Sequence, residues 1–219
     1  AGNHILTISN FKAKLWDVSG QLLTDFIVPH TNILSAAFSP QGDLVFLYFI
    51  NSVVKVYRLD GQVVSEFKGC NIAETSSVFS PDGDKILIVS TSDGLLSLMT
   101  TKGETMLEIK GQFDCSTSAI FSPTGDRVLT ISTDGVAELW NLEGDLLTKF
   151  IGTDSWGAYA AFSPSGEFVL TIFEGYEIKL WNLQGELLID FGTEEEIPEV
   201  AIFSPTKDEI LVEYENGTR

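Results

Sequence analysis

Hydrophobic and polar residues alternate along the chain in short runs such as VLTIS, VAELWNL and LLTKFI. These runs are rich in β-branched and aromatic residues and are separated by turn residues, a pattern typical of short β-strands. Asp-Gly pairs at residues 93–94 and 134–135 suit tight hairpins. No long stretch keeps a helical period, so the pattern predicts an all-β meander of antiparallel strands.

The alternating pattern itself repeats along the chain. The word Phe-Ser-Pro begins at Phe38, Phe79, Phe121, Phe162 and Phe203, so successive copies lie 41 or 42 residues apart. A second motif, LWNLEG in its clearest copy, recurs at the same spacing of 41 or 42 residues. Each period holds four predicted strands, here called a to d, which are TSAIFS, RVLTIS, VAELWNL and LLTKFI in residues 116–151. A four-stranded meander has two apolar faces, so the repeats are expected to pack face to face.

The run GTDSWGAYAAFSPSGEFVLTIFEGYEIKLWNLQGELL resembles a blade of a WD-repeat β-propeller, in the bacterial style with FSPxG after strand a and LWxLxGxLL across strands c and d. The resemblance covers essentially the whole chain and implies four-stranded antiparallel blades. In that family a Gly-His pair, a Ser, an Asp and a Trp form a structural hydrogen-bonded tetrad. The nearest copy here is Gln112, Ser132, Asp134 and Trp140, so no blade holds an intact tetrad.

We therefore interpret the recurrent residues as structural. Ser132 and Asp134 belong to one blade's copy of the tetrad. The recurrent aromatic residues are expected in the core between blades, because each large apolar side chain contributes about 1.5–3 kcal/mol when fully buried. These aromatic residues are Phe38, Phe79, Phe121, Phe162 and Phe203 at the end of strand a, and Trp16, Tyr57, Trp140 and Trp181 on strand c.

Residues 1–219 are expected to form a single WD-repeat region. The predicted groups of strands are 4–28 (b to d), 33–68, 74–110, 116–151 and 157–191 (a to d), and 199–214 (a and b). About five repeats are present. If they closed into a five-bladed ring, the last strand a would complete the first blade and the last strand b would be left over. A closed five-bladed ring with a displaced end, part of a larger ring such as a seven-bladed one, and a ring completed by a second copy all remain open. We favour part of a larger ring, because an uncapped edge invites pairing.

The composition narrows the choice of partners. With 31 acidic and 13 basic residues the formal net charge is −18, which disfavours nucleic acid and anionic membranes as partners. The acidity either serves solubility or favours a basic partner. The longest apolar run, LVFLYFI, is far shorter than the roughly 20 residues of a spanning helix. No leader is evident and two cysteines make no disulfide framework, so we expect a soluble, cytoplasmic protein.

Catalytic motifs are missing from the sequence. His4 and His30 have no metal-like spacing with other ligands, and there is no nucleophile elbow, phosphate-binding glycine loop or zinc-protease word. We therefore expect no enzyme activity, no cofactor and no metal. Loop acids such as Glu174 and Glu177 keep a carbohydrate-binding or hydrolytic propeller as the least favoured alternative.

The segments entering strand a differ between repeats, reading PHTNI, GCNIAE, GQFDCS, GTDSWG and GTEEEIPE. Binding residues often lie on variable loops carried by a rigid scaffold. The family resemblance places these segments on the top face of the propeller, with Trp156 as an anchor of the kind enriched at binding hot spots. The candidate binding residues are Asn32, Phe113, Asp114, Asp154, Trp156, Glu194, Glu195, Glu196 and Ile197.

These segments predict a non-enzymatic scaffold that binds a protein or peptide. The more specific version of this hypothesis is that the partner is basic. The alternative is a sensor or regulatory propeller at the C-terminal end of a multidomain bacterial signalling protein. Self-association through unpaired blade edges is a further expectation.

Overall fold

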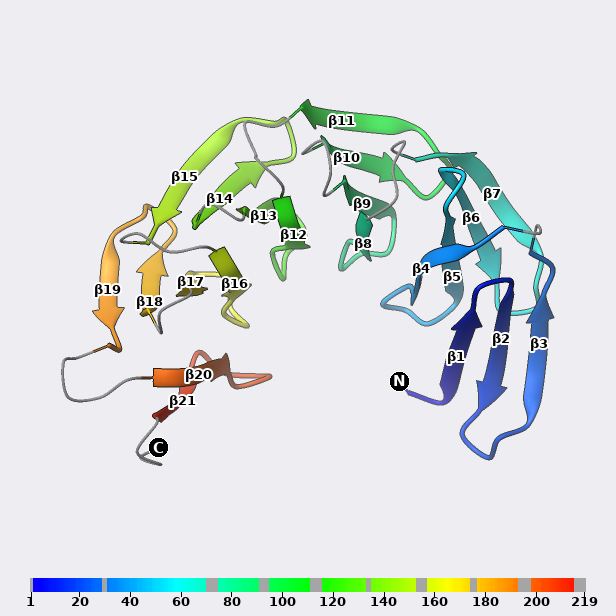
Figure 1. The fold of residues 1–219 in the computed structure, drawn as a ribbon, viewed down its shortest axis with the longest axis horizontal. Helices are drawn as coiled ribbons and strands as arrows, with labels where there is room; N and C mark the ends of the chain where they lie inside the picture. Colours follow the sequence, from blue (N-terminus) through cyan, green and yellow to red (C-terminus); the bar gives the residue numbers. More distant parts are fainter. Residues whose placement is uncertain are drawn as a thin grey trace. The chain divides into compact units, whose positions relative to one another are not determined.

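The computed structural model describes residues 2–28, 31–69, 75–90, 95–110, 116–132, 135–152, 157–173, 177–192 and 198–214 (Figure 1). In this part of the chain the structure has 21 strands and no helix. All strand pairs are antiparallel and join neighbours in the sequence. The all-β antiparallel class predicted from the alternating pattern is therefore confirmed.

The strands form six sheets. Sheet 1 contains β1 (His4–Ser9), β2 (Lys12–Asp17) and β3 (Leu22–Phe26). Sheet 2 contains β4 (Ile33–Phe38), β5 (Leu44–Phe49), β6 (Val53–Arg58) and β7 (Val63–Lys68). Sheet 3 contains β8 (Thr75–Phe79), β9 (Lys85–Ser90), β10 (Leu95–Thr100) and β11 (Thr105–Lys110). Sheet 4 contains β12 (Ser116–Phe121), β13 (Arg127–Ser132), β14 (Val136–Asn141) and β15 (Leu146–Ile151). Sheet 5 contains β16 (Gly157–Phe162), β17 (Phe168–Phe173), β18 (Glu177–Asn182) and β19 (Leu187–Asp190), and sheet 6 contains β20 (Pro198–Phe203) and β21 (Ile210–Tyr214).

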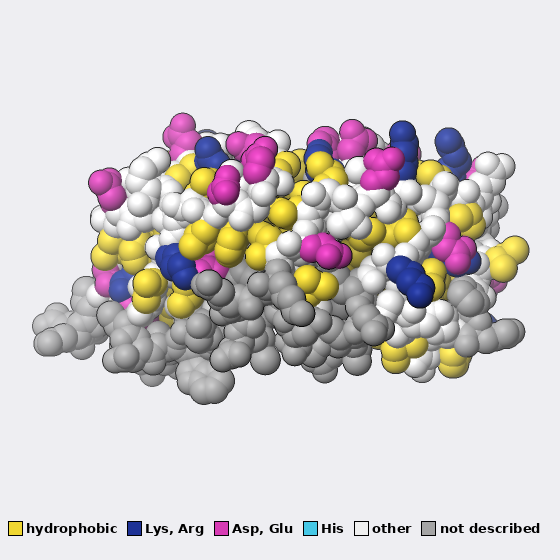
Figure 2. Space-filling model, turned by 90° about the horizontal axis from the view of Figure 1, so that it is seen from above, with side chains coloured by type: hydrophobic (Ala, Val, Ile, Leu, Met, Phe, Trp, Pro, Cys, Tyr) yellow, Lys and Arg dark blue, Asp and Glu magenta, His cyan; other side chains and the backbone are white. Residues whose placement is uncertain are grey.

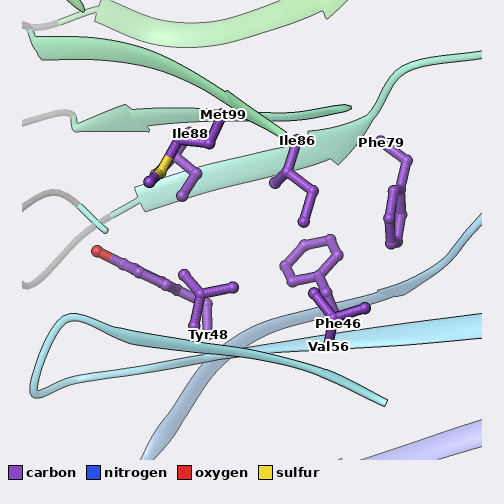
Figure 3. Packing of buried hydrophobic residues seen from close by; sticks show 8 residues of the cluster. Phe46, Tyr48, Val56, Phe79, Ile86, Ile88 and Met99 are labelled. Carbon is purple, nitrogen blue, oxygen red and sulfur yellow. The ribbon is translucent and has the colours of Figure 1, made fainter. Parts of the chain in front are cut away.

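The chain divides into two compact units, Ala1–Gln112 and Phe113–Arg219. In unit 1 each sheet packs its apolar face on the next. One core joins sheets 1 and 2 and consists of Ala13, Leu15, Phe26, Val45, Leu47, Phe49 and Tyr57. The next joins sheets 2 and 3, where Phe46 and Phe79 meet edge to face with ring centroids 5.3 Å apart (Figure 3).

Unit 2 is built in the same way. Sheets 4 and 5 share a core of Leu129, Ile131, Ala137, Leu139, Phe150, Ala160, Val169 and Trp181. Sheets 5 and 6 share a smaller core of Leu170, Ile178, Ala201 and Val212. Fully buried side chains of this size each stabilise the fold by about 1.5–3 kcal/mol, so the contacts between sheets are a main source of stability.

Of the aromatic residues expected to be structural, Phe79, Tyr57 and Trp181 belong to these cores, and Phe38, Phe162 and Phe203 pack against them. Phe79, Phe121, Tyr57 and Trp181 are buried, while Phe38, Phe162, Phe203, Trp16 and Trp140 are half-buried. The Tyr57 hydroxyl donates to the carbonyl oxygen of Ile27 at 3.1 Å. Burial, with a smaller effect of the Glu66 charge, raises the pKa of Tyr57 to about 12. Asp134 lies outside the described residues.

The serine of the Phe-Ser-Pro word fixes the turn between strands a and b. The backbone N–H of the first residue of strand b donates a hydrogen bond to the serine hydroxyl. The N–O distances are 3.0 to 3.1 Å for Ser39, Ser80 and Ser122. These serines are almost fully buried. The glycine of the same word, for example Gly42, has a positive φ of 74°, which only glycine adopts without strain. The word FSPxG is therefore a turn.

Strand c tryptophans are held by a threonine on strand b. The indole N–H donates to the hydroxyl of Thr7 from Trp16 (2.8 Å), of Thr130 from Trp140 (3.0 Å), and of Thr171 from Trp181 (2.8 Å). Thr130 lies two residues before Ser132, whose own hydroxyl donates to the carbonyl oxygen of Val136 at 3.0 Å. The resemblance had pointed to Ser132 as the strand b member of this group.

Ion pairs also recur, at one cross-strand position between strands c and d. Lys14 pairs with Asp25 (3.2 Å), Lys55 with Glu66 (2.9 Å), and Lys179 with Asp190 (3.9 Å). In sheet 4 the two signs are exchanged, because Glu138 on strand c pairs with Lys149 on strand d at 2.7 Å. The residues of each pair are direct partners in the sheet register.

Candidate functional site

The variable segments leave the sheets at one common end. In an antiparallel meander the connection from strand b to c and the connection from strand d to the next strand a lie at the same end of the sheet. We call this end the loop edge. Among the residues of unit 1 that the structure describes, it comprises residues 10–11 and 50–52, residues 27–28 and 31–32, and Gly69.

Backbone hydrogen bonds fix the loop edge of unit 1. The N–H of Ile33 donates to the carbonyl oxygen of Asn10, and the N–H of Ile50 donates to that of Asn32, each at 3.0 Å. The Gly69 N–H donates to the Ser52 carbonyl oxygen at 2.7 Å. The turns of sheets 1 and 2 and the segment entering β4 are thus joined through the main chain.

Large apolar side chains are exposed on this fixed edge. Phe11 is 52 % exposed, Ile50 is 47 % exposed, and Ile27 is 89 % exposed. Asn32 lies on the same edge, and its buried side-chain Oδ1 has no hydrogen-bond partner among the residues that the structure describes. Three large apolar side chains are therefore exposed on an edge whose backbone is held by hydrogen bonds, and they are candidates for contact with a partner.

Glycines begin the segments that leave strands d in sheets 2 and 4. A Cβ added at Gly69 would lie 2.7 Å from the Tyr48 ring, and one added at Gly152 would lie 2.9 Å from the Phe173 ring. Real side-chain carbons do not come this close, so both positions require glycine. In unit 2 the Gly152 N–H also donates to the Gly135 carbonyl oxygen at 3.4 Å. These two variable segments therefore start from a fixed point.

Of the candidate binding residues, only Asn32 lies in the part of the chain that the structure describes. Phe113, Asp114, Asp154, Trp156, Glu194, Glu195, Glu196 and Ile197 lie outside it, as do His30, Cys70 and Cys115. Their roles stay predictions. His4 is exposed on β1, and the described residues contain no group of three or more histidine, cysteine or acidic side chains that could hold a metal.

Sequence reasoning missed Phe11, Ile27 and Ile50. A signal was present, because each is a large apolar residue in or next to a segment predicted to be a connection. Other exposed apolar residues lie on strands d, including Leu22, Val63 and Leu146. Figure 2 shows hydrophobic side chains interspersed with acidic and basic ones on the face that it views. Scattered apolar residues of this kind are ordinary on protein surfaces.

A scan against protein-family models finds no match to the chain, and a search of curated proteins finds none either. The fold and the loop edge define an all-β protein of repeated antiparallel sheets. Among the described residues, no helix has the length and the apolar character to span a membrane.

Proposed function

We propose that the protein is a non-enzymatic scaffold that binds a protein or peptide at the loop edge, and that its sheets are blades of a WD-repeat β-propeller. The repeated words FSPxG and LWxLxG support the family. Face-to-face packing of successive sheets within each unit supports blades, because propeller blades bury their apolar faces in this way.

The observation that carries the binding proposal is the exposure of Phe11, Ile27 and Ile50 on a hydrogen-bonded edge. Large apolar side chains supply much of the energy at protein interfaces. A backbone that is already ordered loses little conformational entropy when it binds. A partner covering these side chains gains about 25 cal/mol for each Å² of apolar surface removed from water.

In unit 2 we propose that Trp156 and the acidic run Glu194–Glu196 contact the partner. By sequence they occupy the segments corresponding to the one that contains Asn32. The tryptophan supplies an anchor, and the glutamates favour a basic partner.

A displayed library of random peptides supplies the probe for this proposal. Peptides selected on the wild-type chain are titrated against a variant with Phe11→Ser and Ile50→Ser, against Trp156→Ala, and against a variant with Glu194, Glu195 and Glu196 changed to lysine. We expect at least one of the three to weaken binding about tenfold or more, since burying one large apolar side chain is worth that much.

The matched control is Val64→Ser, which changes a comparably exposed apolar residue on β7, away from the loop edge. It should leave the affinity unchanged. Wild-type affinity in all three loop variants, or a loss confined to Val64→Ser, would contradict the proposal.

A further inference from the structure

Sheet 5 has a carboxylate at a position where sheets 1 to 4 have none. The sequence predicts a loop residue at Glu177, but this glutamate is the first residue of β18, the strand c of sheet 5. The strands c of sheets 1 to 4 begin with Lys12, Val53, Leu95 and Val136. The repeat therefore does not require an acidic side chain at this position, which lies at the loop edge.

The Glu177 carboxylate is largely excluded from water. Its side chain is 13 % exposed, and it pairs with Lys179, whose side chain is 8 % exposed. The Lys179 ammonium also faces Asp190 at 3.9 Å and the ring of Trp181, whose centroid is 5.9 Å away. Glu177 and Lys179 thus form a largely buried ion pair next to the core that sheets 4 and 5 share.

A buried ion pair is a poor means of stabilising a fold. Taking two charges out of water is costly, and apolar residues of similar size are often as stable in the same place, or more stable. Sheet 2 shows that the repeat folds without such a pair at the loop edge. Its strand c begins with Val53, and Lys55 pairs with the more exposed Glu66 on β7. The pair in sheet 5 therefore calls for a role other than stability.

The Glu177 carboxylate reaches the start of a variable segment. Its Oε2 lies 3.0 Å from where a Cβ would stand at Gly152, which directly follows β15 and precedes residues 153–156. The Phe173 ring lies 2.9 Å from the same point, and the Gly152 N–H donates to the Gly135 carbonyl oxygen. A carboxylate, an aromatic ring and a backbone hydrogen bond thus fix the place from which the segment leaves.

We propose that Glu177 and Lys179 are positioning residues of the loop edge in unit 2, and that they set the direction in which the segment carrying Trp156 leaves Gly152. Lys179 holds the carboxylate, and the carboxylate forms one wall at Gly152. A segment with a fixed start loses less conformational entropy when it binds, so the pair raises affinity without touching the partner. The inference rests on the proposed function, because it needs Trp156 to contact the partner.

The test uses the whole 219-residue chain and a library-selected peptide whose binding Trp156→Ala weakens. The double variant Glu177→Val, Lys179→Met replaces the pair by apolar residues and leaves no new unpaired charge beside the core. Its midpoint of urea denaturation should equal or exceed that of the wild type. Its affinity for the peptide should nevertheless fall about tenfold, because the segment loses its fixed start. A structural role alone would lower the midpoint.

The matched control is Lys55→Met, Glu66→Val, which removes the ion pair between strands c and d of sheet 2. Both double variants remove one positive and one negative charge, so neither alters the net charge of −18. The control should bind the peptide like the wild type. In the Trp156→Ala background, loss of the Glu177–Lys179 pair should cost little further affinity, since the residue that it positions is then absent.

Four results would overturn the proposal. One is wild-type affinity in the Glu177→Val, Lys179→Met variant. Another is an equal loss in the sheet 2 control, which would indicate a general effect of removing ion pairs. The third is a lower urea midpoint or a failure to fold, which would assign the pair to stability. The fourth is a library that yields no peptide sensitive to Trp156→Ala, which would also refute the part of the proposed function that concerns unit 2.

Discussion

At the scale of single residues, threonine and tryptophan change together in this chain. Strand b has a threonine wherever strand c has a tryptophan, at Thr7, Thr130 and Thr171. Where strand c has Tyr57 or Met99 instead, the matching strand b residue is Leu47 or Ile88. The hydroxyl is thus kept only where an indole N–H needs an acceptor, as expected if an unpaired buried donor is costly.

Sheet 5 offers the clearest test, because Thr171 and Trp181 are both buried. Thr171→Val keeps the shape of the side chain and removes the acceptor. We expect a loss of about 1–3 kcal/mol in the free energy of unfolding, measured by urea denaturation. Thr171→Ser keeps the hydroxyl and should cost less. Equal stability of the valine variant and the wild type would refute this role of the hydroxyl.

The exchanged charges of sheet 4 allow a second test at this scale. Glu138→Lys should destabilise the protein, because a buried site then faces Lys149 with a like charge. Adding Lys149→Glu restores opposite charges in the order found in the other sheets. Urea denaturation of both singles and the double should give a coupling free energy of about 0.5–3 kcal/mol. Purely additive effects would show that the pair has no mutual interaction.

The position of the tryptophan's partner was beyond sequence reasoning. Thr130 and Ser132 are two residues apart on β13, so their side chains lie on the same face of the sheet. Both are hydroxyl residues and both precede the same turn. Only the register, in which Trp140 lies opposite Val128, brings the indole within reach of Thr130.

At the scale of elements, the strands were predictable and their connections were not. The period of two fixes which residues face the core, and a repeat of 41 or 42 residues restates that signal several times. The motif FSPxG could be recognised as a turn between strands because it recurs with the same spacing. The segments that enter strand a share no pattern, so sequence indicated where binding residues lie but not their geometry.

The glycines Gly69 and Gly152 govern how those segments begin. Gly152→Ala should lower the free energy of unfolding by about 1–3 kcal/mol, because the methyl group would collide with the Phe173 ring. Gly69→Ala should do the same through Tyr48. The neighbouring exposed change Ile151→Ala should stay within about 0.5 kcal/mol of wild type. Thermal unfolding that does not distinguish Gly152→Ala from Ile151→Ala would contradict this packing argument.

At the scale of the whole molecule, the net charge of −18 is the feature that most affects association. A large negative charge either keeps the protein soluble or attracts a basic partner, and ionic strength separates the two. If the charge attracts partners, peptides selected on the chain should be rich in lysine and arginine. Their association rate should fall about tenfold or more as salt rises from 10 mM to 1 M, because screening removes the attraction. Selected peptides that are neutral and insensitive to salt would leave solubility as the role of the charge.

The central claim is that the loop edge is the binding surface of this repeat protein. Hydrogen exchange on the wild-type chain, with and without a library-selected peptide, tests it most directly. The account predicts slowed exchange at residues 10–11 and 50–52 or at Gly135 and Gly152, which belong to the loop edges, and unchanged exchange in the turns between strands c and d. Protection confined to those opposite turns, such as the one at Gly61, would contradict it.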